Sequence, residues 1–199
     1  EDELNLYSKE TIKENNTFTI TYTGNLGLAQ DLNKFLAVAK KMRDVQNITF
    51  KILGYGKNVK QVHEYINQNN LHNVELLSAR SRNETLLEVS KADIAYVSLV
   101  ESDVFKTVLP GKIIDYMCMK KPIIADVSGY AEEIIQHANC GYVLKKGTLE
   151  EMVDEINNFR ENPSLRIELG ENGYQYAYHN LRWKTNINKL VKVMEGLNG

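Results

Sequence analysis

The sequence predicts an α/β protein with a single domain, built on a doubly wound parallel sheet of about six strands. Three observations support this prediction. Short β-branched or aromatic runs alternate with amphipathic helical stretches, glycine or other turn residues follow the strands, and the connections are short. Such connections between parallel strands place helices on both faces of one sheet.

Composition narrows the class of protein. The chain has 199 residues, of which 43% are hydrophobic and 25% charged, which is typical of a soluble globular protein. Its net charge of −2 gives no electrostatic reason to expect nucleic-acid binding. Cys118 and Cys140 match no metal or redox spacing, so we expect free buried thiols in a reducing cytoplasm. No apolar run approaches the ~20 residues of a membrane span, and no export signal is recognisable.

The first third of the chain contains two units of strand, glycine turn and helix. Residues 1–16 are polar without a regular apolar face, and we expect a linker or peripheral segment. A strand over 18–23 leads into a glycine turn at 24–27 and then a helix. A strand over 48–53 leads into a turn at 54–56 and a second helix. The apolar faces of these helices are predicted at Leu32, Phe35, Leu36, Ala39 and Met42, and at Val59, Val62 and Ile66.

Two further strands follow, over 74–77 and 92–99. Between them, Ser81 and Glu84 form a capping box that starts a helix with Leu86, Leu87 and Val89 on its apolar face. The next predicted elements are a strand over 123–125, a helix over 130–137 and a strand over 141–144. Two more helices follow. The first begins with a second capping box of Thr148 and Glu151, and the second is capped by Asn162 with Pro163 at its first position.

The last helix is expected to begin near Trp183. Its apolar stripe either packs into the core, which is the interpretation we favour, or covers a neighbouring domain; the stripe consists of Trp183, Ile187, Leu190, Val191 and Met194. The predicted division is a linker at 1–16, a nucleotide-binding domain at 17–180 and a C-terminal crossover helix at 181–199.

The stretch 107–126 organises the functional prediction. Pro110 suits the first position of a helix, and Gly111 beside it allows a ligand close to the backbone. The first turn of a helix offers free N–H groups and a partial positive charge, to which Lys112 adds a full charge, while Asp115 lies one turn further on. This end of the helix can hold phosphate and hydroxyl groups together, although many helices that begin with proline are purely structural.

The predicted topology gathers several loops around this helix. Ligands of doubly wound sheets bind at the carboxyl ends of the strands. The loops that follow strands, and so should meet at that edge, are 24–27, 54–56, 78–82, 101–109 and 126–129. Neither glycine loop has the Gly-x-Gly-x-x-Gly spacing of a dinucleotide site, and no Walker-type phosphate loop is present, so both of those classes are disfavoured.

Five runs together carry a family resemblance: Tyr22 to Gln30, Leu53 to Gly56, Phe105 to Met117, Lys121 to Ala125, and Gly170 to Gly173. They resemble the C-terminal, donor-binding half of a retaining bacterial glycosyltransferase with two Rossmann-like domains, the GT-B fold, of the family 4 type. More narrowly, the pattern is similar to capsule and O-antigen sugar transferases that carry Pro-Ser-Lys-Leu-Phe-Glu-Tyr-Met at the central helix.

The resemblance implies roles for individual residues. Gly24, Asn25, Gly27, Lys106, Thr107, Val108, Leu109, Gly111 and Lys112 would bind the donor diphosphate, Asp115 the ribose, and Gly54, Arg80, Ser81 and Arg82 the base. Four departures concern the identity of the donor. Gly111 replaces a usual serine, Asp115 a glutamate, and Thr107 a glutamate of the broader family. Asn25 and Asp31 stand where many relatives have an arginine and a lysine, which leaves Lys106 and Lys112 as the expected cations.

The same resemblance implies a substrate and partners. The donor would be a nucleotide sugar, with UDP as the usual nucleotide, and no cofactor or metal is expected, since the four histidines show no ligand spacing. The acceptor would bind in a preceding second domain that this sequence does not contain. In the resembling group the acceptor is commonly a lipid-linked sugar, so the work would take place in the cytoplasm at the inner face of the membrane, in surface polysaccharide biosynthesis. Catalytic groups for the acceptor would belong to that other domain.

Two alternatives remain open at this point. A nucleotide-sugar 2-epimerase shares the two-domain architecture and would be distinguished by carboxylates in its other domain. A stand-alone nucleotide-binding or interaction module would instead have a polar outer face around Trp183.

Overall fold

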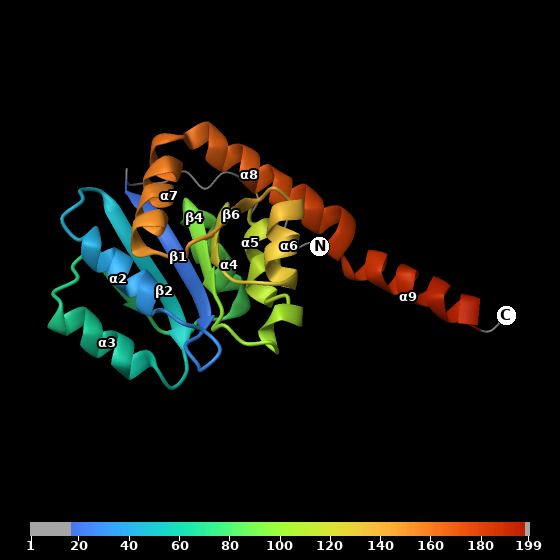
Figure 1. Cartoon of the computed structure of the whole chain (residues 1–199), viewed down its shortest axis with the longest axis horizontal. Coiled ribbons are helices and arrows are strands. Elements are labelled where there is room, and N and C mark those ends of the chain that lie inside the picture. The colour runs from blue at the N-terminus through green and yellow to red at the C-terminus, as the bar shows by residue number, and fades with distance from the viewer. Residues whose placement is uncertain (1–16, 198–199) are drawn as a thin grey trace.

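A single parallel sheet of six strands runs through the protein (Figure 1). The computed structural model describes residues 17–197. The strands are β1 (Phe18–Asn25), β2 (Ile48–Tyr55), β3 (Val74–Leu77), β4 (Ile94–Ser98), β5 (Ile123–Asp126) and β6 (Gly141–Val143). Their order in the sheet is β3-β2-β1-β4-β5-β6, and every pairing is parallel. The predicted doubly wound, Rossmann-like fold is therefore confirmed.

Helices cover both faces of this sheet (Figure 1). One hydrophobic core joins the sheet to α2 (Asn33–Lys41), α3 (Val59–Gln68) and α7 (Leu149–Glu161), and a second joins it to α4 (Arg82–Lys91), α5 (Gly111–Cys118) and α6 (Tyr130–His137). The remaining helices are α8 (Pro163–Tyr176), which packs against α5 and α7, the π-helical turn η2 (Ala177–Leu181), and α9 (Trp183–Leu197).

Most predicted elements agree with the structure, and the exceptions have local causes. The strand Val74–Leu77 and the helix Tyr130–His137 have the predicted bounds. Strand β2 continues through Gly54 and Tyr55, which pair with the end of β1, so the turn predicted there starts later. On α4, Leu86 and Val89 are buried as predicted, whereas Leu87 is exposed.

Helix caps were predicted with mixed success. Ser81 and Glu84 form the complete capping box. Thr148 accepts a hydrogen bond from the N–H of Glu151, but the carboxylate of Glu151 turns back to the N–H groups of Lys145 and Lys146, so that box is only half formed. Asn162 and Pro163 occupy the predicted cap and first positions of α8, but the Asn162 side chain forms no cap bond, because its amide donates to the preceding turn of α7. Pro110 occupies the cap of α5 with extended backbone, one residue before the predicted helical position.

Helix α9 extends away from the sheet (Figure 1). The five side chains of its predicted apolar stripe are 39–79% exposed, with Trp183 the most exposed. Core packing of this stripe was therefore the wrong interpretation. The outer face around Trp183 is also not the polar surface expected of a stand-alone module. The predicted linker at 1–16 lies outside the described residues. Within residues 17–197, the helices are all too short or too polar to cross a bilayer.

Candidate functional site

The N-terminal end of α5 lies open at the carboxyl edge of the sheet. Pro110 precedes the helix with φ −61° and ψ 130°, and no side chain among the described residues caps it. Gly111 is exposed, and a Cβ atom added to it would meet no atom of the described residues within 4 Å. Because the first N–H groups of a helix have no partner within the helix, this end is suited to an anion.

Lys112 is the most unusual charged residue of this edge. Its Nζ is buried and has no hydrogen-bond partner among the residues that the structure describes. It lies 3.9 Å from the centre of the Tyr22 ring, whose face attracts a cation. Burial alone lowers the pKa of the Lys112 ammonium to about 7. The predicted phosphate-binding lysine therefore points inward rather than into solvent.

Gly24 lies next to the Lys112 ammonium. Its φ of +117° favours glycine, and a Cβ atom there would lie 3.4 Å from Lys112 Nζ. The neighbouring backbone is held in place by Tyr116 of α5, because the N–H of Thr23 donates to the Tyr116 hydroxyl at 2.9 Å. The end of β1 and the first turns of α5 thus form one connected unit.

The other predicted diphosphate residues of the β1–α2 loop differ in exposure. Asn25 is exposed, and a Cβ atom at Gly27 would lie 3.0 Å from its side-chain nitrogen. Gly54, predicted to contact the base, is buried inside β2, where an added Cβ atom would overlap the Leu26 side chain. Gly54 therefore allows the Leu26 side chain of this loop to pack closely against β2, and it is too buried to contact a base.

Asp115 and Arg82, predicted to bind the ribose and the base, contact each other. Arg82 donates to both carboxylate oxygens of Asp115, with the shorter contact at 2.8 Å. The Asp115 side chain is 28% exposed and that of Arg82 is 60% exposed. The structure thus joins two predicted subsites into one pair at the rim of the edge, which the sequence did not indicate.

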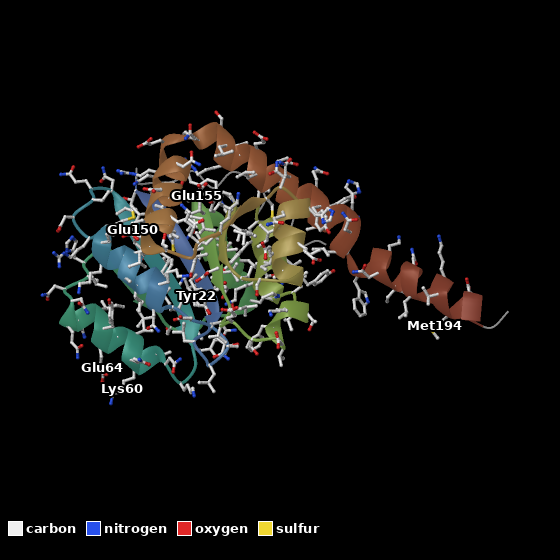
Figure 2. All side chains as sticks on the ribbon, viewed as in Figure 1. Tyr22, Lys60, Glu64, Glu150, Glu155 and Met194 are labelled. Atoms are coloured by element: carbon white, nitrogen blue, oxygen red, sulfur yellow. The ribbon has the colours of Figure 1, made fainter. Side chains whose placement is uncertain are left out.

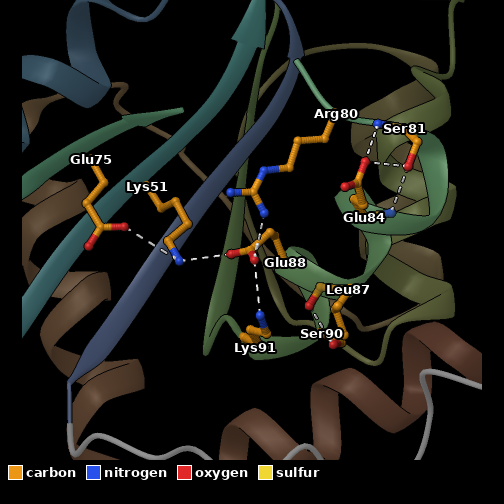
Figure 3. Close-up of polar contacts among 9 residues, drawn as sticks. All are labelled: Lys51, Glu75, Arg80, Ser81, Glu84, Leu87, Glu88, Ser90 and Lys91. Atoms are coloured by element: carbon orange, nitrogen blue, oxygen red, sulfur yellow. Dashed lines mark hydrogen bonds and ion pairs between the residues drawn. The ribbon is translucent and has the colours of Figure 1, made fainter. Parts of the chain in front are cut away.

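The side chains of Arg80 and Ser81, which were predicted to bind the base, form hydrogen bonds with neighbouring residues of the protein (Figure 3). Arg80 donates to Glu88 at 3.1 Å, and Glu88 also accepts from Lys51 and Lys91. Although burial raises the pKa of the Glu88 carboxyl, the hydrogen bonds from Lys91 and Lys51 outweigh it and hold the pKa below its ordinary value. The Ser81 hydroxyl belongs to the capping box. These contacts fix the loop that carries Arg82.

The loop before α5 contains the short helix η1 (Phe105–Thr107). Lys106 pairs with Asp103 at 2.8 Å, and the Thr107 hydroxyl donates to the carbonyl of Val104. The next two residues of the predicted diphosphate end, Val108 and Leu109, are 39% exposed and half-buried, respectively. The backbone of η1 passes so close to Gly129, where φ is +67°, that any side chain there would overlap it.

Sequence reasoning missed a third cation at this edge. Lys34 of α2 forms an ion pair with Asp126, the last residue of β5. The available signal was its place one turn after Asp31 at the start of a helix, but its partner lies 92 residues further along the chain. A separate open hollow of about 90 Å³ lies between α2 and α3, lined in part by Gln30, Asn58 and Gln61.

The edge shows no features of a metal or thiol site. Within the described part of the chain, no group of three or more His, Cys, Asp or Glu side chains is placed to hold a metal ion. Both cysteines are free, and burial raises the pKa of Cys118 to about 11 and of Cys140 to about 12. Thiols with such pKa values are poor nucleophiles at neutral pH.

The doubly wound sheet, with an open helix end at its carboxyl edge, defines a Rossmann-like α/β domain. The chain belongs to the family described as glycosyl transferases group 1, whose model matches residues 5–176.

Two curated relatives are uncharacterized glycosyltransferases of Methanocaldococcus jannaschii. MJ1178 is 28% identical over 151 residues, which cover 76% of this chain and 41% of the relative. MJ1069 is 24% identical over 193 residues, which cover 95% of this chain and 47% of the relative. The chain thus spans less than half the length of these two proteins.

Solved structures share the fold at low identity. Anabaena HepE in complex with UDP-glucose has a TM-score of 0.77 at 16% identity, covering 98% of this chain and 53% of that one. The C-terminal domain of a group 1 family protein, LpcC from Francisella tularensis, has a TM-score of 0.69 at 17% identity and covers 83% of this chain and 87% of that domain.

Proposed function

We propose that this chain is the donor-binding half of a retaining glycosyltransferase that uses a nucleotide sugar, with UDP as the nucleotide. The observation that carries the proposal is the open N-terminal end of α5 with the Nζ atom of Lys112 next to Gly24, an atom for which residues 17–197 offer no hydrogen-bond partner. Both features favour an anion with several oxygens, and a diphosphate is such an anion.

The proposed site divides between two parts of the donor, the diphosphate and the ribose. The backbone of Gly111 and the ammonium of Lys112 bind the diphosphate, together with Gly24 of the β1–α2 loop. Asp115 accepts from the ribose hydroxyls, and Arg82 holds its carboxylate in position. HepE, which shares this fold, has been crystallised in complex with UDP and with UDP-glucose, and this supports a uridine nucleotide for the present chain.

Sugar transfer is proposed to require a second, acceptor-binding domain that faces this edge. The chain aligns with less than half of its curated relatives and with almost the whole of an isolated C-terminal domain. A role in surface polysaccharide synthesis is supported by the resemblance and by the fold shared with WaaG, a glycosyltransferase involved in lipopolysaccharide biosynthesis, at a TM-score of 0.67. The lipid-linked acceptor at the inner face of the membrane belongs to this proposal.

Calorimetric titration with UDP, uridine and pyrophosphate tests the proposal. We expect UDP to bind with a Kd of ~0.1–1 mM, because half of a cleft leaves the diphosphate partly hydrated. Lys112→Ala should weaken UDP binding by ~10-fold to ~150-fold, the equivalent of one charge-assisted hydrogen bond, and should leave uridine binding unchanged. No heat with UDP at millimolar concentration would contradict the donor-binding assignment. An equal loss for UDP and uridine would show that Lys112 is only structural.

A further inference from the structure

We propose that Lys112 binds the diphosphate by taking up a proton: above neutral pH its buried amine is mostly uncharged in the free protein, and it accepts a proton from solvent when a diphosphate occupies the end of α5. This inference rests on the proposed function. The inference goes beyond the proposed function, because proton uptake by Lys112 would make donor binding depend on pH through a single residue.

The first support is the position of the Nζ atom. Burial removes water from this atom, and no described residue offers it an acceptor. The ring of Tyr22 offers only its face. An isolated ammonium is costly in such surroundings, so the neutral amine is favoured until an anion arrives. The resulting pKa of about 7 lies within the range where a small change of environment changes the charge.

The second support is that nearby ionisable groups do not compensate this charge. From β1, Tyr22 stays neutral, because burial raises its pKa. On α5 itself, burial also raises the pKa of Tyr116, while the Asp115 carboxylate is paired with Arg82 of α4. The pKa of Lys112 is lowered by burial, and no charged group among residues 17–197 contributes to this shift.

The loops of the same edge also keep their charges in pairs. Lys106 of η1 pairs with Asp103, and Asp126 at the end of β5 pairs with Lys34 of α2. Neither carboxylate is therefore left to neutralise the Lys112 ammonium. A bound diphosphate would be the first strong acceptor available to it.

The third support is that residue 24, which lies next to this amine, is a glycine. Gly24 carries no side chain, and a Cβ atom there would lie 3.4 Å from Lys112 Nζ, so residue 24 leaves this side of the amine uncovered. Diphosphate binding would then move the Lys112 pKa back toward its ordinary value or above it. The complex holds more protons than the free protein above pH ~7, so affinity should fall as pH rises, at most tenfold per unit.

The test is calorimetric titration with UDP-glucose in two buffers of different ionisation enthalpy. The diphosphate of this probe is esterified at both ends, so it does not itself titrate between about pH 6 and pH 8. We expect an uptake of ~0.9 proton per ligand at pH 8 and ~0.1 at pH 6. Lys112→Arg keeps the charge at every pH and should abolish both the proton uptake and the pH dependence of the Kd.

Lys60→Met is the matched control, since Lys60 lies in the first turn of α3, apart from Tyr22 (Figure 2), and its side chain is 88% exposed. This variant should take up the same protons as the wild type. UDP-glucose binding by the wild type at about pH 8 without proton uptake would overturn the inference while leaving the proposed function intact. Absence of any UDP-glucose binding at millimolar concentration would overturn both.

Discussion

Replacing Lys112 by methionine should stabilise the free protein, and more so at lower pH. The variant keeps the length of the side chain and removes its charge. In the fold the pKa of Lys112 is about 7, compared with 10.5 for an exposed lysine, because burial disfavours the ammonium. The unfolded chain therefore binds more protons between these two values, and the stability of the wild type should rise with pH across that window.

The size of the effect follows from the same shift. At 1.36 kcal/mol per pKa unit, the lowered pKa of Lys112 costs the wild type of the order of 3–5 kcal/mol near pH 6, where the buried amine is charged, and about 2 kcal/mol near pH 9, where it must lose its proton on folding. Contact of the ammonium with the Tyr22 ring offsets part of this cost. Lys112→Met should therefore raise the free energy of unfolding by roughly that amount near pH 6 and by clearly less near pH 9.

Urea denaturation at several pH values measures this difference directly. Lys60→Met should follow the wild type at every pH, because its side chain lies in solvent. A Lys112→Met variant that is no more stable than the wild type near pH 6, or whose advantage does not change with pH, would refute the reasoning. Lys112 would then be charged and solvated in the fold.

Three further predictions concern the ribose subsite, the buried carboxylate and the glycines. Asp115→Asn should weaken UDP binding by ~1–3 kcal/mol without affecting pyrophosphate, and the assignment fails if 2′-deoxy-UDP and UDP bind the wild type alike. Glu88→Gln should destabilise the fold near neutral pH and make its stability less sensitive to acid. The wild type loses the stabilising contribution of this carboxylate as pH falls through its lowered pKa, and the amide has no such contribution to lose. Equal acid sensitivity of the two proteins in urea denaturation would contradict this prediction. Gly170→Ala should lower the free energy of unfolding by ~1–3 kcal/mol, since its Cβ atom would overlap the backbone of Lys120. Gly196→Ala should be neutral or slightly stabilising, because no described atom lies within 4 Å of its added Cβ. Similar shifts of the melting temperature for both variants would count against the packing of α8 on α5.

The fold could be predicted from the sequence because its signals are local. The β-branched runs, the glycines after β1 and the Ser81 capping box each specify a strand, a turn or a helix start within a few residues. The predictions of the second capping box and of the turn at Gly54 were wrong where a residue formed a different contact from the one that its local sequence indicated. The carboxylate of Glu151 had backbone N–H groups closer at hand than the cap, and Gly54 had a pairing partner at the end of β1.

The candidate site was predictable in outline only. Its helix end and Gly24 follow from motif and topology. The ion pairs of Arg82 with Asp115 and of Lys34 with Asp126 join residues 33 and 92 positions apart, and the direction of a long side chain depends on the packing around it. For the same reason, periodicity revealed the apolar stripe that ends at Met194 of α9 (Figure 2) but did not indicate that it is exposed.

Amide NMR during a titration with UDP tests the central claim most directly, because it locates the ligand on the fold. We expect UDP to cause concentration-dependent shifts of the backbone amides of Gly24, Gly111, Lys112 and Asp115, and uridine alone to affect chiefly Asp115 and its surroundings. Pyrophosphate should affect the first three. Shifts confined to another part of the surface, such as the hollow between α2 and α3, would contradict the claim that the end of α5 is the diphosphate site.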